Sequence, residues 1–369
     1  MLSRDAIDIL ANRIVGVYAR FHTSVLESIA RHLANMDYAS AAWQVNRGIE
    51  AGLLIADILE MSQRLSSASQ DELRRILTDA ADLTLDFDDQ IYTAAGFTPL
   101  QMHLNPNMAR ILAIGFNRTF GTMQNLTGTT ALLAQQSFIQ AADQAYMQVV
   151  TGTFSYQDAI RSAIKKVVGD GINVRYASGA KEQIDSAMRK VVLTGVSKTA
   201  GDIQMERARE LGVAHVEVSA HIGARNRGTG PMNHEEWQGA VYSLFGDTRY
   251  PDFITTTGYG TGEGLHGWNC RHSFYPFFEG ISRAFYDEKS RTELQRDVTY
   301  RGKKMSQYEA SQIQRYIERN IRQAKREKQA LEAAGLPGSS DRIHSWQARA
   351  RQFTNETGLY RQYEREQID

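Results

Sequence analysis

Apolar residues recur at steps of three and four in IDILANRIVGVYARFHTSVLESIARHL, residues 7–33. Such steps place side chains on one face of an α-helix, so the segment predicts a long amphipathic helix with that face in a protein core. Similar spacing in the following segments predicts a predominantly helical chain. The apolar positions of this first segment are Ile7, Leu10, Ile14, Val17, Phe21, Val25, Ile29 and Leu33.

An N-terminal helical region is expected to extend over residues 1–152. After the first helix, a second is predicted over 43–61. A third is predicted to begin at Ser69, because Ser69 and Glu72 have the spacing of a capping box. Two more helices are expected after a loop that contains prolines.

A mixed α/β core is expected over residues 153–282. Two helices are predicted in its first half, over about 155–167 and 178–211. Apolar and polar residues then alternate in HVEVSAH (215–221), which predicts a strand, and AVYSLF (240–245) predicts a second strand. Long loops are expected in the stretch that carries Gly258, Gly260, Gly262, Gly264 and Gly267.

A helical, basic C-terminal tail is expected over residues 283–369. Ser306 and Glu309 have the spacing of a capping box, and an apolar stripe follows them, as in a helix that packs along another helix. The opposite face is basic, since residues 301–328 contain 9 Lys or Arg and only 3 Glu. The predicted fold class is therefore α+β, predominantly helical, with a small sheet in the central core.

Charge is distributed unevenly along the chain. The formal net charge at pH 7 is zero, which gives no global basic field for nucleic acid. Residues 1–150 nevertheless hold 15 Asp or Glu against 10 Arg, and residues 281–369 hold 18 Lys or Arg against 13 Asp or Glu. One hypothesis is that the acidic end binds protein and the basic tail faces DNA. For segment 301–328 itself we favour a solvated helix face with Glu–Arg pairs, and weak non-specific contact with DNA is the alternative.

Cysteine content and hydropathy limit the cellular location. The only cysteine, Cys270, excludes an intrachain disulfide and fits a reducing compartment. Asp5 and Asp8 lie where a secretory signal needs basic and then apolar residues, so no signal peptide is expected. No apolar run approaches the roughly 18 residues that span a bilayer. Synthesis in the cytoplasm and no membrane partner are therefore expected.

Histidines are concentrated around the only cysteine. Structural zinc sites use about four Cys or His ligands in a tetrahedral arrangement. His221, His234, Cys270 and His272 form a candidate set, with His266 as a substitute. Five of the nine histidines lie within 58 residues: His215, His221, His234, His266 and His272.

Two other interpretations of these side chains remain open. Cys270 could act as a nucleophile with His221 or His234 as its base, although no local cysteine-protease signature accompanies it. We favour a polar network that holds the glycine-rich loops against the sheet, with Trp237 and Trp268 supplying buried area. The glycine-rich segments lack the GxxxxGK[ST] pattern, which excludes a P-loop nucleotide site.

The chain resembles the phage minor capsid protein 2 family in three segments. These are HVEVSAHIGARNRGTGPMNHEEWQGAVYSL (215–244), GTGEGLHGWNCRHSFYPFFEGIS (260–282) and QIQRYIERNIRQAKREKQALEAAG (312–335). The middle block is also similar, more loosely, to Mu F-like head-morphogenesis proteins, which commonly have a second Cys where this chain has His272. The positions that match the family pattern are His221, Gly223, Arg225, Gly230, His234, Trp237, Gly239, Asn269, Cys270, Arg271 and His272.

The resemblance implies a structural minor capsid protein in the virion of a bacteriophage. It implies association with the portal protein and with capsid or scaffold proteins, in head assembly or genome delivery. It implies no enzymatic activity, no catalytic residues and no cofactor. The alternative function is a metal-binding or hydrolytic effector domain centred on the histidine and cysteine set, with zinc as its metal.

Overall fold

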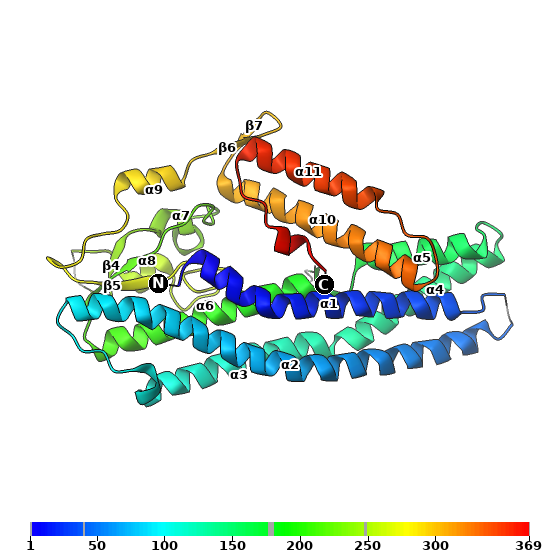
Figure 1. The fold of residues 1–369 in the computed structure, drawn as a ribbon, viewed down its shortest axis with the longest axis horizontal. Coiled ribbons are helices and arrows are strands. Elements are labelled where there is room, and N and C mark those ends of the chain that lie inside the picture. The colour runs from blue at the N-terminus through cyan, green and yellow to red at the C-terminus, as the bar shows by residue number, and fades with distance from the viewer. Residues whose placement is uncertain (1, 40, 176–180, 247–248, 369) are drawn as a thin grey trace.

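The molecule is an elongated helical framework with a small sheet at one end (Figure 1). The computed structural model describes residues 2–39, 41–175, 181–246 and 249–368. Long helices run along the long axis, and two C-terminal helices lie along one side of them (Figure 1). The predicted α+β fold class with a dominance of helices is confirmed.

The first two helices form the long axis of the framework. Helix α1 (Arg4–Asn35) begins at Ser3, whose hydroxyl accepts a hydrogen bond from the backbone N–H of Ala6. Its predicted apolar face is buried against helix α2 (Trp43–Ala94), which runs back in the opposite direction (Figure 1). This first helix was therefore predicted correctly from the spacing of its apolar residues.

The predicted helix start at Ser69 is wrong, because α2 continues through it without a break. The Ser69 hydroxyl donates to the carbonyl oxygen of Leu65 at 2.7 Å, a bond made inside a helix. Glu72 forms an ion pair with Arg13 of α1 at 2.6 Å instead of reaching back to a helix terminus. The apolar spacing continues across this point, and tertiary packing keeps the helix intact.

Four further helices complete the bundle. Helix α3 follows the short 3-10 helix η1 (Met102–Leu104) and begins with Pro106 at a position where a proline costs no hydrogen bond. The minor strands β1 (Asn173–Arg175) and β2 (Lys181–Gln183) precede the last helix of this group. The four helices are α3 (Pro106–Gly128), α4 (Thr130–Val150), α5 (Tyr156–Asp170) and α6 (Ile184–Glu210).

Helices α3 and α6 approach each other closely through glycine. A Cβ atom on Gly115 of α3 would lie 2.2 Å from Oγ1 of Thr199 on α6. A Cβ atom on Gly195 of α6 would lie 2.3 Å from Oγ1 of Thr119 on α3. The two glycines therefore make room for two threonines, and this contact fixes how α6 crosses the bundle toward the sheet.

The main sheet has three antiparallel strands in the order β4-β3-β5. The predicted strands are β3 (His215–Val218) and β4 (Val241–Ser243), whereas β5 (Phe274–Phe277) was not predicted. Val216 of the central strand lies opposite Tyr242 on one side and Pro276 on the other. The short elements η2 (Gly230–Met232), α7 (His234–Trp237) and α8 (Phe253–Thr257) surround this sheet.

The C-terminal segment returns along the bundle. The capping box predicted at Ser306 is confirmed, with Ser306 and Glu309 each bonded to the backbone N–H of the other. Helix α10 packs against α1 and α5 and pairs with α11. The elements are α9 (Glu288–Leu294), β6 (Val298–Tyr300), β7 (Lys303–Met305), α10 (Gln307–Ala333), α11 (Asp341–Thr357) and η3 (Tyr363–Glu366).

The basic side of α10 only partly faces solvent. Arg326 is buried, and its guanidinium donates to Asp185 of α6 at 3.0 Å. Arg322 donates to the same carboxylate at 3.1 Å. Residues 301–328 therefore do not form one solvated basic face, because part of their charge is used inside the protein.

The buried apolar residues form one large core and smaller ones. The largest core joins α1 to α6 with the end of α10 at Ala330 and Leu331. A second core lies under the main sheet, and a third lies between α10 and α11. The division into residues 1–152, 153–282 and 283–369 stays a prediction. No helix among the described residues combines the length and hydropathy needed to cross a membrane.

Candidate functional site

The ends of two neighbouring strands bring His221 and His272 together. Val218, the last residue of β3, lies opposite Phe274, the first residue of β5. Beyond this pair, the N–H of Ser219 donates to the carbonyl oxygen of Ser273 at 2.8 Å, which continues the pairing outward. The imidazole rings of His221 and His272 then stack with centroids 4.2 Å apart.

The short helix α7 supplies His234 to the same place. Its neighbour Trp237 is buried, and the indole N–H donates to the carbonyl oxygen of Pro231 at 3.2 Å. The ring of His234 lies 4.5 Å from that of Trp237 and 5.4 Å from that of His272. The buried indole therefore fixes α7, and α7 places His234 beside the strand ends.

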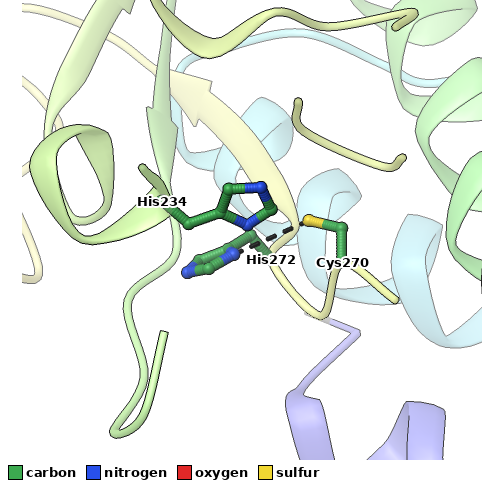
Figure 2. Close-up of side chains that lie close together, drawn as sticks. All are labelled: His234, Cys270 and His272. Atoms are coloured by element: carbon green, nitrogen blue, oxygen red, sulfur yellow. Dashed lines mark hydrogen bonds between the residues drawn. The ribbon is translucent and has the colours of Figure 1, made fainter. Parts of the chain in front are cut away.

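Three side chains converge, one each from His234, Cys270 and His272 (Figure 2). One ligand atom of each lies within 4.8 Å of the other two. The Sγ atom of Cys270 lies 3.6 Å from Nδ1 of His272 (Figure 2). All three residues are at most 3% exposed.

Hydrogen bonds on the far side of each ring determine which nitrogen faces the cluster. Nε2 of His234 lies 2.7 Å from the carbonyl oxygen of Glu263, so it must donate, and Nδ1 keeps its lone pair. Nε2 of His272 lies 3.0 Å from Oε1 of Gln238. That oxygen also accepts from the backbone N–H of His221, which fixes the amide orientation. His272 therefore also keeps its Nδ1 lone pair.

Burial keeps the cluster uncharged. It lowers the pKa of His234 to about 4 and the pKa of His272 well below its ordinary value. Burial raises the pKa of the Cys270 thiol. A buried thiol with a raised pKa is a poor nucleophile, so the geometry gives no support to Cys270 as a catalytic group.

His221 and His266 lie outside this cluster of three. Nδ1 of His221 lies 3.1 Å from the carbonyl oxygen of Ile222, while its buried Nε2 has no hydrogen-bond partner in the part of the chain that the structure describes. His266 lies against α6, with Nδ1 2.9 Å from the hydroxyl of Ser197. A Cβ atom on Gly201 would lie 2.5 Å from the ring of His266, so that glycine makes room for it.

Other motif positions hold the loops around the cluster. Arg225 donates to the carbonyl oxygens of Glu263 and Trp268 at 3.2 and 2.7 Å. Arg271 forms an ion pair with Asp8 of α1 at 3.1 Å. Asn269 has a φ of 56°, a left-handed conformation that asparagine tolerates. The expectation that Trp268 is buried is wrong, because it is 58% exposed.

The motif glycines occupy left-handed backbone positions. Gly223, Gly230 and Gly239 have φ values of 72°, 62° and 67°. The N–H of Gly239 donates to the carbonyl oxygen of Val218 at 3.0 Å. A Cβ atom there would lie 3.1 Å from Cβ of Ala220, so both conformation and space favour glycine.

Comparison with known proteins identifies the family. The sequence model of phage minor capsid protein 2 matches residues 2–355. The chain belongs to the phage minor capsid protein 2 family. It is 29% identical over 239 residues to a structural protein of Lactococcus phage LL-H, a match that covers 61% of this chain and 59% of that protein. It is 35% identical over 128 residues to a structural protein of Lactococcus phage mv4, covering 32% of this chain and 93% of that protein. No solved structure matches the chain.

One residue of the candidate site in this minor capsid protein 2 family member was missed from sequence. Gln238 lies between two predicted motif positions, and its Oε1 accepts from both the backbone of His221 and the ring of His272. Sequence spacing gives no sign that an amide will join two histidines that lie 51 positions apart. The signal was a polar residue within the Trp-Gln-Gly segment, whose neighbours Trp237 and Gly239 were singled out.

Proposed function

We propose that this chain is a structural component of the phage head that binds the portal protein during head assembly or genome delivery. The family match and the structural-protein names of the two relatives support a place in the virion. The proposal includes synthesis in the host cytoplasm and no enzymatic activity. Capsid and scaffold proteins are the other partners that such a role allows.

The observation that supports binding to a protein partner is a row of exposed apolar side chains on α2. Val45, Ile49 and Leu53 are 65%, 56% and 51% exposed and recur at steps of four residues on one face. They lie near the start of α2, at the end of the molecule far from the sheet (Figure 1). Exposed apolar patches commonly mark interaction sites, and the acidic excess of residues 1–150 favours a partner with basic side chains nearby.

The test is co-purification of the full chain with the portal protein of the same phage. Replacing Ile49 and Leu53 with Glu should abolish the complex without lowering the melting temperature, because both side chains are solvent exposed. The control is Ile254→Glu, which changes a side chain that is 52% exposed beside the sheet. Retained binding by the double variant would refute this surface. Absence of the protein from purified virions by mass spectrometry would refute the head role.

Contact with packaged DNA is a weaker part of the same proposal. Arg301, Lys303 and Lys304 are exposed, and they support non-specific binding to phosphates. Such binding should weaken steeply with added salt and should fall when Lys303 and Lys304 are replaced with Glu. Salt-independent binding, or no binding at low salt, would exclude it.

A metal site is the second function that an observation favours. Neutral His234 and His272 direct Nδ1 lone pairs toward Cys270, and donating the other ring N–H to an oxygen is typical of metal-bound histidine. Ligand atoms of a tetrahedral zinc site lie about 3.5 Å apart, so the 4.8 Å cluster would tighten slightly around the ion. The Nε2 of His221 is unpartnered among the described residues, but the ring would have to leave its stacking contact with His272 to become the fourth ligand. Deep burial favours a closed structural site over a hydrolytic one.

Cobalt binding tests this second function directly. Co²⁺ bound to a thiolate gives a near-ultraviolet charge-transfer band, so the band should appear in the wild type and disappear in Cys270→Ser. His234→Gln should weaken binding, whereas His103→Gln, on an exposed histidine elsewhere, should not. Wild-type protein that takes up neither cobalt nor zinc would leave the cluster as a hydrogen-bonded network that holds the loops.

A further inference from the structure

A cavity of about 680 Å³ lies where the two ends of the chain meet the motif loop. Its walls come from α1, α6 and α10, together with the loop at Asn269 and Arg271 and the C-terminal turn η3. Its basic lining is dense. The guanidinium groups that line it belong to Arg13, Arg189, Arg271, Arg315, Arg319, Arg322 and Arg365.

Carboxylates inside the protein neutralise some of these arginines. Asp8 pairs with Arg271 at 3.1 Å and with Arg365 at 3.0 Å. Asp185 pairs with Arg322 at 3.1 Å. These ion pairs hold the paired arginines in place, so they are not free to bind a ligand. Among the remaining acidic lining residues, Glu182 pairs with Lys190, and Glu364 accepts a hydrogen bond from Asn12.

Three other arginines lack a carboxylate partner. Arg189 donates through Nη2 to the side-chain oxygen of Asn12 at 2.7 Å, but its buried Nη1 has no acceptor among the described residues. Arg315 and Arg319 have no hydrogen-bond or ion-pair partner in the described ranges. The carboxylate left to face them is Glu318, whose buried Oε1 is also unpartnered in that part of the chain.

The charges of these groups affect one another strongly. Burial, followed by the charges of Arg271 and Arg365, lowers the pKa of Arg315 to about 9. Burial, followed by the charge of Arg365, lowers the pKa of Arg189 to about 10. Both arginines remain charged at neutral pH. A bound anion would therefore reduce the repulsion between the positive charges that line the cavity.

We propose that this cavity binds a small phosphate-bearing ligand, with Arg189 and Arg315 holding the phosphate and Arg319 completing the site. The planar fork of a guanidinium matches two oxygens of a phosphate, and unpaired donors are available for it. The cavity volume lies within the roughly 300–1,000 Å³ of small-molecule sites, which suits a nucleotide and not a duplex. This inference is independent of the proposed role in the phage head.

Binding should stabilise the protein, because the ligand would join α1, α6 and α10. The full chain is melted in buffers of equal ionic strength that contain chloride, inorganic phosphate, pyrophosphate or ATP. Pyrophosphate and ATP should raise the melting temperature above its value in chloride. Equal melting temperatures in all four buffers would overturn the proposal.

Two variants assign the effect to the cavity. Arg315→Lys keeps the charge but loses the fork, so calorimetric affinity for pyrophosphate should fall at least about tenfold. Arg315→Gln should abolish binding without lowering the melting temperature of the ligand-free protein, since Arg315 is crowded by the charges of Arg271 and Arg365 more than it is offset by those of Asp8 and Glu318. The control Arg209→Gln changes an exposed arginine of the same helix as Arg189 and should bind normally. Unchanged affinity in both Arg315 variants would also overturn the proposal.

Competition identifies the source of the phosphate. Displacement of bound pyrophosphate by ATP, but not by oligonucleotides, would assign the site to a free nucleotide. Displacement by a 5′-phosphorylated oligonucleotide, but not by its 5′-hydroxyl form, would assign it to a nucleic acid end. Equal displacement by both oligonucleotides would mean binding along the phosphodiester backbone, which contradicts a site for one small phosphate-bearing ligand.

Discussion

Asp88 gives the most quantitative prediction about this protein. It lies on α2 beneath the sheet and is 1% exposed. Its Oδ2 accepts from Nε2 of Gln204 at 2.9 Å, while Oδ1 has no partner among the described residues. Gln204 also donates to the carbonyl oxygen of Phe274 in β5, so the contact joins α2, α6 and the sheet. Burial raises the pKa of Asp88 to about 8.

A raised pKa in the folded state makes Asp88 destabilising at neutral pH. The unfolded chain ionises this carboxyl near pH 3.9, so its favourable contribution is complete below that pH and is lost as pH rises through the folded value. The loss has a slope of about 1.4 kcal/mol per pH unit between about pH 4 and pH 8. It reaches about 4 kcal/mol at pH 7, which is a large part of typical domain stability.

Replacing Asp88 with Asn should remove this pH dependence. The amide oxygen of the new side chain can still accept from Gln204, so the Asp88→Asn variant imitates the protonated acid. In urea unfolding followed by circular dichroism, the variant should match the wild type near pH 4 and exceed it by about 4 kcal/mol at pH 7. The control Asp86→Asn removes an exposed carboxylate from the same helix and should show no such trend. A stability difference that stays constant from pH 5 to pH 8 would refute the reasoning.

Three other changes test separate parts of the framework by thermal or urea unfolding. Gly195→Ala should destabilise by about 1–3 kcal/mol through overpacking, and Thr119→Ala should rescue it by removing the atoms in the way. Asp185→Asn should cost about 3–5 kcal/mol, because it leaves Arg326 buried without its carboxylate. Since Arg326 holds the pKa of Asp185 well below its ordinary value despite burial, this contribution is present above about pH 4 and is lost as pH falls further. Ser306→Ala should cost about 1 kcal/mol by removing a helix cap.

Helix positions were predictable from sequence, but helix boundaries were only partly so. The apolar spacing of residues 7–33 was enough to predict α1. The spacing is visible in the local sequence, and the helix is stabilised by burying that one face against the rest of the protein. Ser69 and Ser306 carry the same spacing to a following Glu, yet only Ser306 begins a helix. The difference is tertiary, since α1 packs along α2 on both sides of Ser69, with Ser28 bonded to Asp57 before it and Arg13 paired with Glu72 after it.

The residues of the candidate site were predicted from the sequence, but their arrangement in space was not. His234, Cys270 and His272 were chosen because they are soft ligands in one segment of the chain, and the fold brings these three together. His221 was placed with them as an equal, but its ring stacks on His272 instead of joining the cluster. Strand β5 was hidden within an aromatic, glycine-rich stretch, so the pairing that aligns His221 with His272 was not visible from sequence.

The charge asymmetry between the two ends of the sequence does not separate them in space. Asp8, near the start of α1, pairs with Arg365 in η3 and with Arg271 in the motif loop. Burial would raise the pKa of Asp8, but Arg271 and Arg365 lower it to about 2. One carboxylate therefore ties the acidic end, the basic end and the centre together, and it stays charged at neutral and mildly acidic pH. Much of the excess positive charge of the tail is thereby directed toward α1 and the cavity beside it. The numbers of acidic and basic residues in a segment do not show whether its arginines pair with carboxylates inside the protein or lie on a basic outer surface.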